Sequence, residues 1–225
     1  LAELEALVPV PWNPHPMTEL IAAYRNAGFE ALADGVMAFF ERRADLHRPG
    51  IAFGPDGEGG EPAKLSTDIS LVAIDRSDPE AFALAEVILR GVNAALERYL
   101  QERPLLRDCC PHQSLFVNPI FNLQRYAPGE GFRRWHCDWT LSDEATEPQA
   151  RVLAWILYCN SLPEGGTEFH WQHHHEQAER GKLLIFPAGV SHIHRGRVSQ
   201  EHSKTIATGW INAGTLEGYL KRLAA

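Results

Sequence analysis

The feature that most constrains this chain is a change of pattern near residue 114. From Ser114 onward, short runs rich in β-branched, aromatic and leucine residues are separated by turn residues about every dozen positions. These runs span residues 115–126, 132–139, 152–159, 167–171, 183–186, 192–197 and 204–211. Seven or eight short strands separated by turns are typical of a β-sandwich or a jelly roll, so we expect one of these in the second half.

The first half of the chain has helical periodicity instead. Apolar residues recur at helical spacing over residues 17–29 and 32–40. Asp34 and Gly35 predict a break in this helical region, because neither favours a helix interior. Residues 66–74 alternate between apolar and polar side chains, which predicts a strand.

The clearest helix is predicted over residues 79–101. Its apolar side chains fall on one face, and Pro79 lies near the first turn, where proline is tolerated. Ser77 and Glu80 have the spacing of a capping box, which predicts that Ser77 begins the helix. A shorter helix over residues 215–223 is expected to close the chain.

Composition limits the partners and the compartment. The chain has 225 residues, of which 44% are hydrophobic and 22% charged, as expected of a globular domain with a sizeable core. A net charge of −8 argues against nucleic acid as a partner, because phosphate binding needs a basic face. No apolar run reaches the length of a membrane span. Four cysteines, and no charged-then-apolar signal pattern in residues 1–16, predict reduced thiols and a cytoplasmic protein.

The sharpest local motif is an H-x-D sequence formed by His136 and Asp138. Residues i and i+2 of a strand point to the same side, so this imidazole and this carboxylate would face a common point. His192 and His194 form a second pair with the same parity. Two histidines and one carboxylate, with the rest of the coordination sphere open, form the facial triad of non-haem Fe(II) oxygenases. Parity alone leaves open which of the two later histidines would complete it.

Residues outside the H-x-D motif add to the evidence for a site, because the motif alone occurs often by chance. Lys204 follows His194 by ten residues and lies in a predicted strand that is otherwise apolar and small. Burying the Lys204 ammonium there would cost free energy unless the ammonium paired with an anion. The alternative is that Lys204 lies at a strand end and its side chain reaches solvent. The histidine run at 173–175 is interpreted as a solvated hairpin tip, because adjacent histidines do not easily converge on one ion.

Several segments together resemble the signature of a known family. They are residues 123–126 (LQRY), 128–132 (PGEGF), 136–138 (HCD), 158–160 (YCN), 163–169 (PEGGTEF), 184–189 (LIFPAG) and 194–196 (HRG), followed by Lys204, Thr208 and Trp210. In this order and with these gaps, residues 123–212 resemble the prolyl 4-hydroxylase-like 2-oxoglutarate/Fe(II) dioxygenases. The first 111 residues show no motif of the family.

The resemblance implies a set of metal ligands. His136 and Asp138 match the first two iron ligands of the family. The family's distal histidine precedes a basic residue by ten positions and is often followed by glycine at i+2; His194 satisfies both conditions and His192 neither. The resemblance therefore implies His194 as the third ligand, with His192 behind it as a supporting residue.

The resemblance also implies a cosubstrate pocket. Lys204 would hold the distal carboxylate of 2-oxoglutarate as a charge-assisted pair. Tyr126 and Tyr158 match positions that line this pocket, and a tyrosine hydroxyl there can donate to the same carboxylate. Further residues expected to face the pocket are Gln124, Thr208 and Trp210.

The fold expected from pattern and resemblance is α+β. It is a double-stranded β-helix, a jelly-roll and cupin-like core, buttressed by N-terminal helices. Residues 1–112 are expected to form the helical buttress, packed on the core, and residues 113–225 the dioxygenase domain.

The function implied is that of an Fe(II)- and 2-oxoglutarate-dependent dioxygenase acting as a hydroxylase and releasing succinate and CO2. It would use Fe(II), 2-oxoglutarate and O2, with ascorbate as an optional reductant. The substrate would be a peptidyl residue, of prolyl type, or a small molecule; the sequence does not choose between them. Two alternatives stay open: a metal-dependent cupin enzyme without 2-oxoglutarate, and a non-catalytic binding module on the same barrel.

Overall fold

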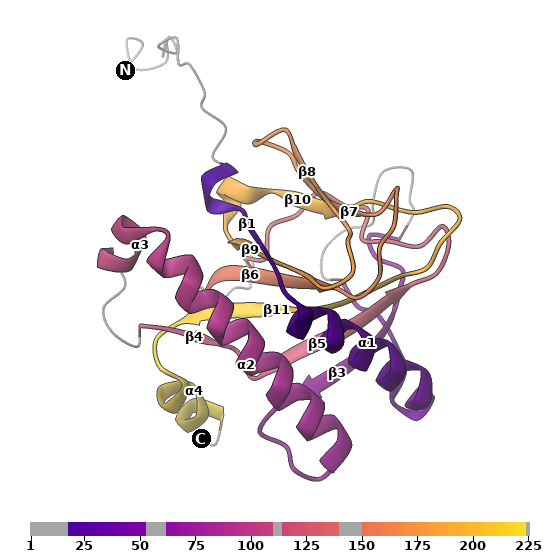
Figure 1. The fold of residues 1–225 in the computed structure, drawn as a ribbon, viewed down its shortest axis with the longest axis horizontal. Helices are drawn as coiled ribbons and strands as arrows, with labels where there is room; N and C mark the ends of the chain where they lie inside the picture. The colour runs from indigo at the N-terminus through magenta and orange to yellow at the C-terminus, as the bar shows by residue number, and fades with distance from the viewer. Residues whose placement is uncertain (1–17, 53–61, 110–113, 140–149, 224–225) are drawn as a thin grey trace, which may run out of the picture.

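Two antiparallel sheets, with helices covering one of them, make up the part of the chain that this computed structural model describes: residues 18–52, 62–109, 114–139 and 150–223 (Figure 1). Within these residues the larger sheet has eight strands in the order β1-β9-β6-β11-β5-β3-β2, with β4 also paired to β11. The smaller sheet has the order β10-β7-β8. All strand pairs are antiparallel.

The bounds of the elements are as follows. The strands are β1 (Ala22–Arg25), β2 (Arg48–Pro49), β3 (Thr67–Val72), β4 (Leu115–Val117), β5 (Ile120–Tyr126), β6 (Arg151–Tyr158), β7 (Gly166–Phe169), β8 (His174–Gln177), β9 (Lys182–Pro187), β10 (His194–Gly196) and β11 (Lys204–Ala213). The helices are α1 (Ala27–Arg42), α2 (Pro79–Gln101), α3 (Pro104–Cys109) and α4 (Leu216–Leu223), with short 3-10 turns η1 (Thr18–Leu20), η2 (Ala44–Leu46) and η4 (Val190–His192).

The expected strands of the second half are confirmed in part. Strands β6, β7, β9 and β11 lie where the pattern predicts them. The run at 115–126 forms two strands, because Pro119 between them has no N–H for the ladder and the Asn118 side chain accepts from Ile120 N instead. The prediction of a regular strand over 132–139 is wrong. Only single bridges occur there, one of them between His136 and His194.

The expected helices are also confirmed in part. Helix α2 has the predicted bounds, but its N-cap is Asp78, whose Oδ1 accepts from two backbone N–H groups, and not Ser77. The prediction of a helix over 17–29 is wrong for most of its length, because residues 22–25 pair with β9 as strand β1. The predicted break at Gly35 is absent: α1 runs through it, and a Cβ at this position would lie 3.9 Å from Leu84 Cδ1 of α2, an ordinary contact distance.

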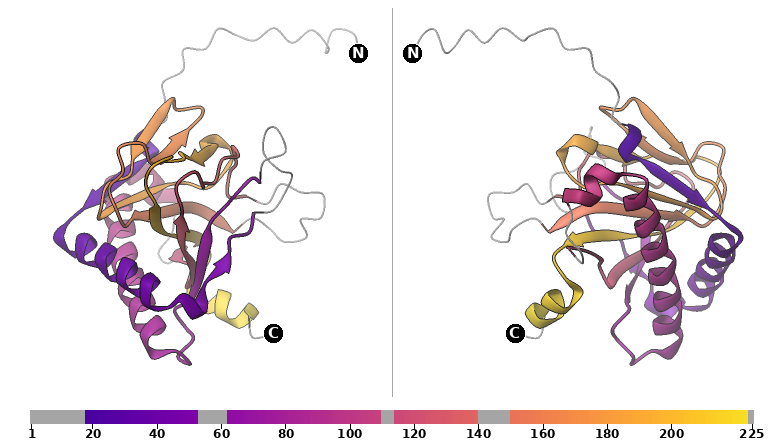
Figure 2. Two further views of the ribbon diagram at one scale, coloured as in Figure 1. Left: turned by 90° about the vertical axis from the view of Figure 1, so that its right-hand side faces the viewer. Right: turned by 60° about the vertical axis from the view of Figure 1, so that its left-hand side comes forward.

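The larger sheet separates two apolar cores by strict alternation. In β6 every second side chain, such as Trp155 and Leu157, belongs to the core shared with α1 and α2, which cover this face of the sheet (Figures 1 and 2). The intervening side chains, such as Ile156 and Tyr158, belong to the core on the other face, toward the smaller sheet. This second face carries the cavity described below.

The N-terminal half contributes strands as well as helices. Strand β3, predicted over 66–74, pairs with β5, and β2 extends the sheet beyond β3. Strand β1 pairs with β9 at the opposite edge. Both edges of the larger sheet therefore come from residues before 112, among those that the structure describes. None of the described helices is long and apolar enough to cross a bilayer.

We predict that Leu157→Ala lowers the free energy of unfolding by about 2–5 kcal/mol. Leu157 is 1% exposed beneath the helices, and its truncation would leave a cavity in a close-packed core. Leu105→Ala is the control, because Leu105 is 81% exposed, and it should change stability by less than about 0.5 kcal/mol. Urea unfolding measures both; equal effects would contradict the packing described.

Candidate metal centre and adjoining cavity

Three side chains converge to form a candidate metal site. His136, Asp138 and His194 each offer one ligand atom, and these atoms lie within 4.8 Å of one another. The Nε2 of His194 is 3.8 Å from Oδ2 of Asp138, and the two imidazole centroids are 4.4 Å apart. This is the only such group of three among the residues that the structure describes. Two imidazoles and one carboxylate are the donor set of a non-haem iron facial triad.

Backbone hydrogen bonds hold the two histidines together. His136 N donates to the carbonyl of His194 at 2.9 Å, and His194 N donates back at 2.8 Å. Asp138 N donates to the Ala188 carbonyl at the end of β9, which fixes the third residue. The predicted i, i+2 arrangement of His136 and Asp138 is thus produced by pairing with two other segments and not by a continuous strand.

The imidazole tautomers suit metal binding. Nδ1 of His136 lies 2.9 Å from the Arg134 carbonyl, and Nδ1 of His194 lies 3.0 Å from the His192 carbonyl. A carbonyl only accepts, so both Nδ1 atoms carry the proton and both Nε2 atoms keep a lone pair. Burial, with the second imidazole beside it, lowers the pKa of His136 to about 3, so the ring stays neutral at physiological pH.

The carboxylate of Asp138 also favours a bound cation. Its Oδ2 is buried and has no hydrogen-bond partner in the described part of the protein. A buried carboxylate oxygen without a donor is costly unless a cation or proton meets it. The orphaned oxygen faces the two Nε2 lone pairs, so the residues present fit a divalent metal ion.

His192 lies outside this group. It is fully buried in the turn η4, where its Nδ1 lies 3.0 Å from the Ser191 hydroxyl. The expectation that His192 and His194 share one strand face is wrong, because the strand begins only at His194. Its backbone carbonyl, which accepts from His194 Nδ1, gives His192 a supporting position behind the candidate ligand.

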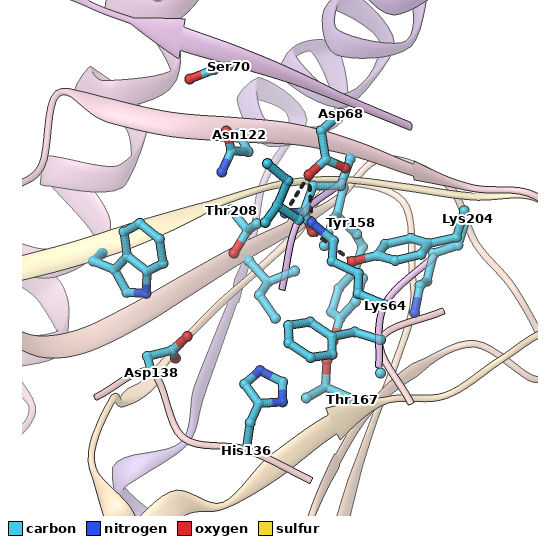
Figure 3. Close-up of a pocket in the computed structure, with 18 of the residues that line it drawn as sticks. Lys64, Asp68, Ser70, Asn122, His136, Asp138, Tyr158, Thr167, Lys204 and Thr208 are labelled. Carbon is cyan, nitrogen blue, oxygen red and sulfur yellow. Dashed lines mark hydrogen bonds and ion pairs between the residues drawn. The ribbon is translucent and has the colours of Figure 1, made fainter. Parts of the chain in front are cut away.

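A cavity of about 420 Å³ is lined by two of the three residues, His136 and Asp138 (Figure 3). His136 and Asp138 lie on one side of it, and Lys204, from the start of β11, lies on its wall. The Lys204 ammonium is buried, donates to the Arg197 carbonyl at 3.1 Å and lies 4.8 Å above the Tyr126 ring. Burial lowers the pKa of Lys204 to about 8, and the structure shows no carboxylate paired with it among the described residues.

Gly196 leaves room for this lysine. A Cβ at that position would lie 3.1 Å from the Lys204 ammonium nitrogen. The glycine two residues after His194 therefore has a steric reason in this chain: strand β10 passes close to the end of the lysine side chain.

All six residues expected in the cosubstrate pocket line the cavity: Gln124, Tyr126, Tyr158, Lys204, Thr208 and Trp210. The Tyr126 hydroxyl donates to Gln124 Oε1 at 2.6 Å, and the Tyr158 hydroxyl lies 2.7 Å from Thr167 Oγ1. Thr208 donates to the Trp155 carbonyl. The face of Trp210 is stacked by the guanidinium of Arg151, at 3.6 Å from the ring centroid.

The sequence interpretation missed the wall that the N-terminal half supplies. Strands β2 and β3 and the residues beside them add Arg48, Lys64, Asp68 and Ser70, while Asn122 of β5 lies opposite Ser70. The alternation of Asp68 and Ser70 in the predicted strand was a signal that both face one side. Nothing in the sequence indicated that this side would meet the histidines.

The histidines of the run at 173–175 stay apart from the site. His173 lies in the turn between β7 and β8 with a φ of 48°, and His174 and His175 follow in β8. His175 contacts the Gly165 carbonyl and His174 contacts Glu176. The expected hairpin is present, and none of these residues belongs to the candidate metal group.

Comparison with known proteins supports this chemistry. The family model described as the 2OG-Fe(II) oxygenase superfamily matches residues 121–212, which hold all three candidate ligands and Lys204. This match confirms the expected resemblance to the 2OG-Fe(II) oxygenases and the expected dioxygenase class. The family uses Fe(II), 2-oxoglutarate and O2. A search of curated proteins gives no significant match.

Solved structures share the fold over nearly the whole chain. A viral collagen prolyl hydroxylase from Paramecium bursaria Chlorella virus-1, solved as a 2OG complex, has a TM-score of 0.61 at 16% identity and covers 87% of this chain and 97% of its own. A Pseudomonas putida prolyl-4-hydroxylase has 0.58 at 18%, with 88% and 95% covered. A Trichoplax adhaerens prolyl hydroxylase, solved with a hypoxia inducible factor peptide fragment, has 0.56 at 10%, with 93% and 89% covered.

We predict that His194→Ala abolishes Fe(II) binding and that His192→Ala retains most of it. The first change removes a candidate ligand atom, whereas the second removes a side chain outside the group. His136→Ala and Asp138→Ala should behave like His194→Ala. Anaerobic Fe(II) titration, with circular dichroism to check folding, decides the matter. Loss of iron in His192→Ala with retention in His194→Ala would contradict the assignment.

Proposed function

We propose that this protein is a hydroxylase that binds Fe(II) through His136, Asp138 and His194 and 2-oxoglutarate through Lys204. The observation that carries the proposal is that two members of a candidate facial triad, His136 and Asp138, border the same cavity as a buried lysine, which has no carboxylate partner among the described residues. Asp138 Oδ2 has no hydrogen-bond partner, and Lys204 has no carboxylate partner, among the residues that the structure describes. An iron ion would satisfy the first and a dicarboxylate the second.

The chemistry divides between the metal and the chain. When bound, Fe(II) would supply the oxygen activation that couples oxidative decarboxylation of 2-oxoglutarate to hydroxylation of a C–H bond. The side chains would do the rest: the two imidazoles and Asp138 would present three ligand atoms, and Lys204 would orient the cosubstrate. No titratable side chain is needed as an acid or base.

Lys204 is a better partner for the cosubstrate than the second buried lysine of the cavity. Lys64 is already neutralised by Asp68 at 2.5 Å. Among the described residues, Lys204 contacts a carbonyl and an aromatic face, and no carboxylate compensates its charge. The other proposed pocket residues, Gln124, Tyr158, Thr208 and Trp210, would wall the cosubstrate, with Tyr126 beneath the ammonium.

A peptidyl substrate is the first candidate. The three solved structures named above, which share this fold over most of their length, are prolyl hydroxylases, one of them solved with a peptide fragment. A small-molecule substrate is the second candidate, because a cavity of about 420 Å³ is large enough to hold such a ligand. The comparisons give no support to a cupin enzyme without 2-oxoglutarate or to a binding module.

We also propose that the protein is a double-stranded β-helix and that it is cytoplasmic. The two antiparallel sheets would form the two faces of a double-stranded β-helix, with residues 1–112 as a buttress that also adds edge strands, and 113–225 as the dioxygenase domain. Ascorbate would serve as an optional reductant. Three described cysteines, Cys109, Cys137 and Cys159, are free thiols, which agrees with a cytoplasmic protein.

Succinate release is the experiment that tests the function. Purified protein with Fe(II) and 2-oxoglutarate is offered proline-containing peptides, free amino acids or no acceptor. Succinate formation stimulated by one class identifies that class. Absence of any 2-oxoglutarate decarboxylation, with iron bound, would refute the dioxygenase proposal.

We predict that Lys204→Ala weakens 2-oxoglutarate binding by more than a hundredfold and leaves metal binding nearly intact. A buried carboxylate that loses its ammonium partner costs about 3–5 kcal/mol. Calorimetric titration of 2-oxoglutarate into Mn(II)-loaded protein measures the loss without turnover. Lys182→Ala is a matched control, because Lys182 is also buried but is paired with Glu176 and Glu179 and does not line the cavity. Unchanged affinity in Lys204→Ala would favour the cupin alternative.

We predict that the affinity for 2-oxoglutarate falls as pH rises through about 8. Burial lowers the pKa of the Lys204 ammonium to that value in the free protein, and a bound carboxylate would raise it again. The charged form binds, so the affinity is full below pH 8 and declines above it. Lys204→Arg should flatten this profile, because a guanidinium stays charged. Affinities measured by calorimetry from pH 6.5 to about 9.5 test this; a flat wild-type profile would contradict it.

A further inference from the structure

A hydrogen-bonded chain connects the N-terminal strand β3 with the cavity (Figure 3). The Tyr126 hydroxyl donates to Gln124 Oε1 at 2.6 Å, and Gln124 Nε2 donates to Asp68 Oδ2 at 3.5 Å. Asp68 and Gln124 are cross-strand partners, as are Tyr126 and Lys204. The chain therefore follows neighbouring positions on one face of the sheet, from β3 through β5 to β11.

The carboxylate of Asp68, where this series of hydrogen bonds begins, is fixed by two contacts. Lys64 Nζ lies 2.5 Å from Oδ2, and the Ser66 hydroxyl donates to Oδ1 at 2.7 Å. The side chains of Lys64 and Asp68 are only 3% and 12% exposed. A buried ion pair with an additional hydrogen bond has little freedom to rearrange, because any movement would expose an unpaired charge.

The carboxylate fixes the direction of every hydrogen bond that follows. An ionised carboxylate only accepts, so the Gln124 amide must present its NH2 group to Asp68. Its oxygen then faces Tyr126, and the tyrosine must donate its single proton to it. This proton is therefore committed to Gln124 and is not offered to a ligand in the cavity.

This series of hydrogen bonds ends at Tyr126, which lies beside Lys204. The Tyr126 ring is buried, and the Lys204 ammonium lies 4.8 Å from its centroid. A cation over an aromatic face is attracted by the ring quadrupole, and this attraction depends on where the ring lies. Anchoring the hydroxyl at Gln124 fixes the ring beneath the ammonium.

From these contacts we infer that Asp68 is a positioning residue for the 2-oxoglutarate subsite. It acts through Gln124 and Tyr126, and it makes Tyr126 a ring support for Lys204 and not a hydrogen-bond donor to the cosubstrate. The inference rests on the proposed function, since it assumes that Lys204 binds 2-oxoglutarate. It assigns a role to strand β3, which lies outside the segment that matches the family.

The test removes the ion pair without leaving a buried charge behind. In the double variant Lys64→Met/Asp68→Leu, the amide of Gln124 loses its anchor while the cavity keeps its net charge. We expect 2-oxoglutarate to bind the Mn(II)-loaded variant about 2- to 10-fold more weakly, the effect of one lost hydrogen bond, with Mn(II) binding unchanged. Gln124→Met, which cuts the same chain at its middle, should give the same loss and serves if the double variant fails to fold.

A double-mutant cycle with Tyr126→Phe distinguishes positioning from general damage. The phenylalanine has no hydroxyl, so the chain is already cut, and neither Lys64→Met/Asp68→Leu nor Gln124→Met should weaken binding further in that background. Tyr126→Phe alone should cost no more than about tenfold. Ser66→Ala is the matched control: it removes one bond to Asp68 but leaves the amide direction unchanged, and it should bind like the wild type.

Two results would overturn the inference. Additive losses in the Tyr126→Phe background would show that Asp68 acts elsewhere. A loss well beyond tenfold in Tyr126→Phe alone would show that its hydroxyl donates to the cosubstrate directly. If the wild type binds no 2-oxoglutarate, the proposed function fails and this inference falls with it. If the wild type binds and the cycle is additive, only the inference fails.

Discussion

The pairing of strand β11 with β5 on one side and β6 on the other is the constraint on which the rest of this structure depends. The strand alternates with period two, so Lys204, Ile206 and Thr208 line the cavity, while Ala207 belongs to the core on the helical side. The helical side is so tight that a Cβ at Gly209 would lie 2.8 Å from Phe121 Cβ. A slip of one residue would turn Lys204 into the apolar core and Ala207 into the cavity, and both faces would fail together.

Two buried lysines on the cavity wall show how burial separates structural from functional charge. Lys64 has its carboxylate within the chain, at 2.5 Å, on Asp68, which is the cross-strand partner of Gln124 in β5. Lys204 contacts an aromatic face and a carbonyl, which stabilise an ammonium less than a carboxylate does, and burial lowers its pKa. A dicarboxylate cosubstrate would supply a carboxylate partner on binding.

The candidate metal site depends on chain segments that are distant in sequence and irregular in structure. His136 and His194 are joined by two reciprocal backbone hydrogen bonds, and each imidazole is oriented by the carbonyl two residues before it. The same rule of i and i−2 thus fixes both tautomers, although neither histidine lies within a long strand. The backbone presets the donor atoms before any metal arrives, which lowers the entropy lost on binding.

The sequence by itself determined the class of chemistry and much of the secondary structure. Helix α2 and the strands β6, β9 and β11 follow from local periodicity, which is a property of neighbouring residues. The residues of the cavity near Lys204 follow from the resemblance of the ordered motifs to a known family. It did not determine that residues 22–25 form a strand, that α1 continues through Gly35, or that His192 turns away from His194, because each outcome depends on a partner far along the chain. Only the tertiary structure decided that Asp68 would meet Gln124 and that the N-terminal half would build one wall of the cavity. Cross-strand pairing is a long-range contact, and local sequence carries no record of which strand its neighbour will be.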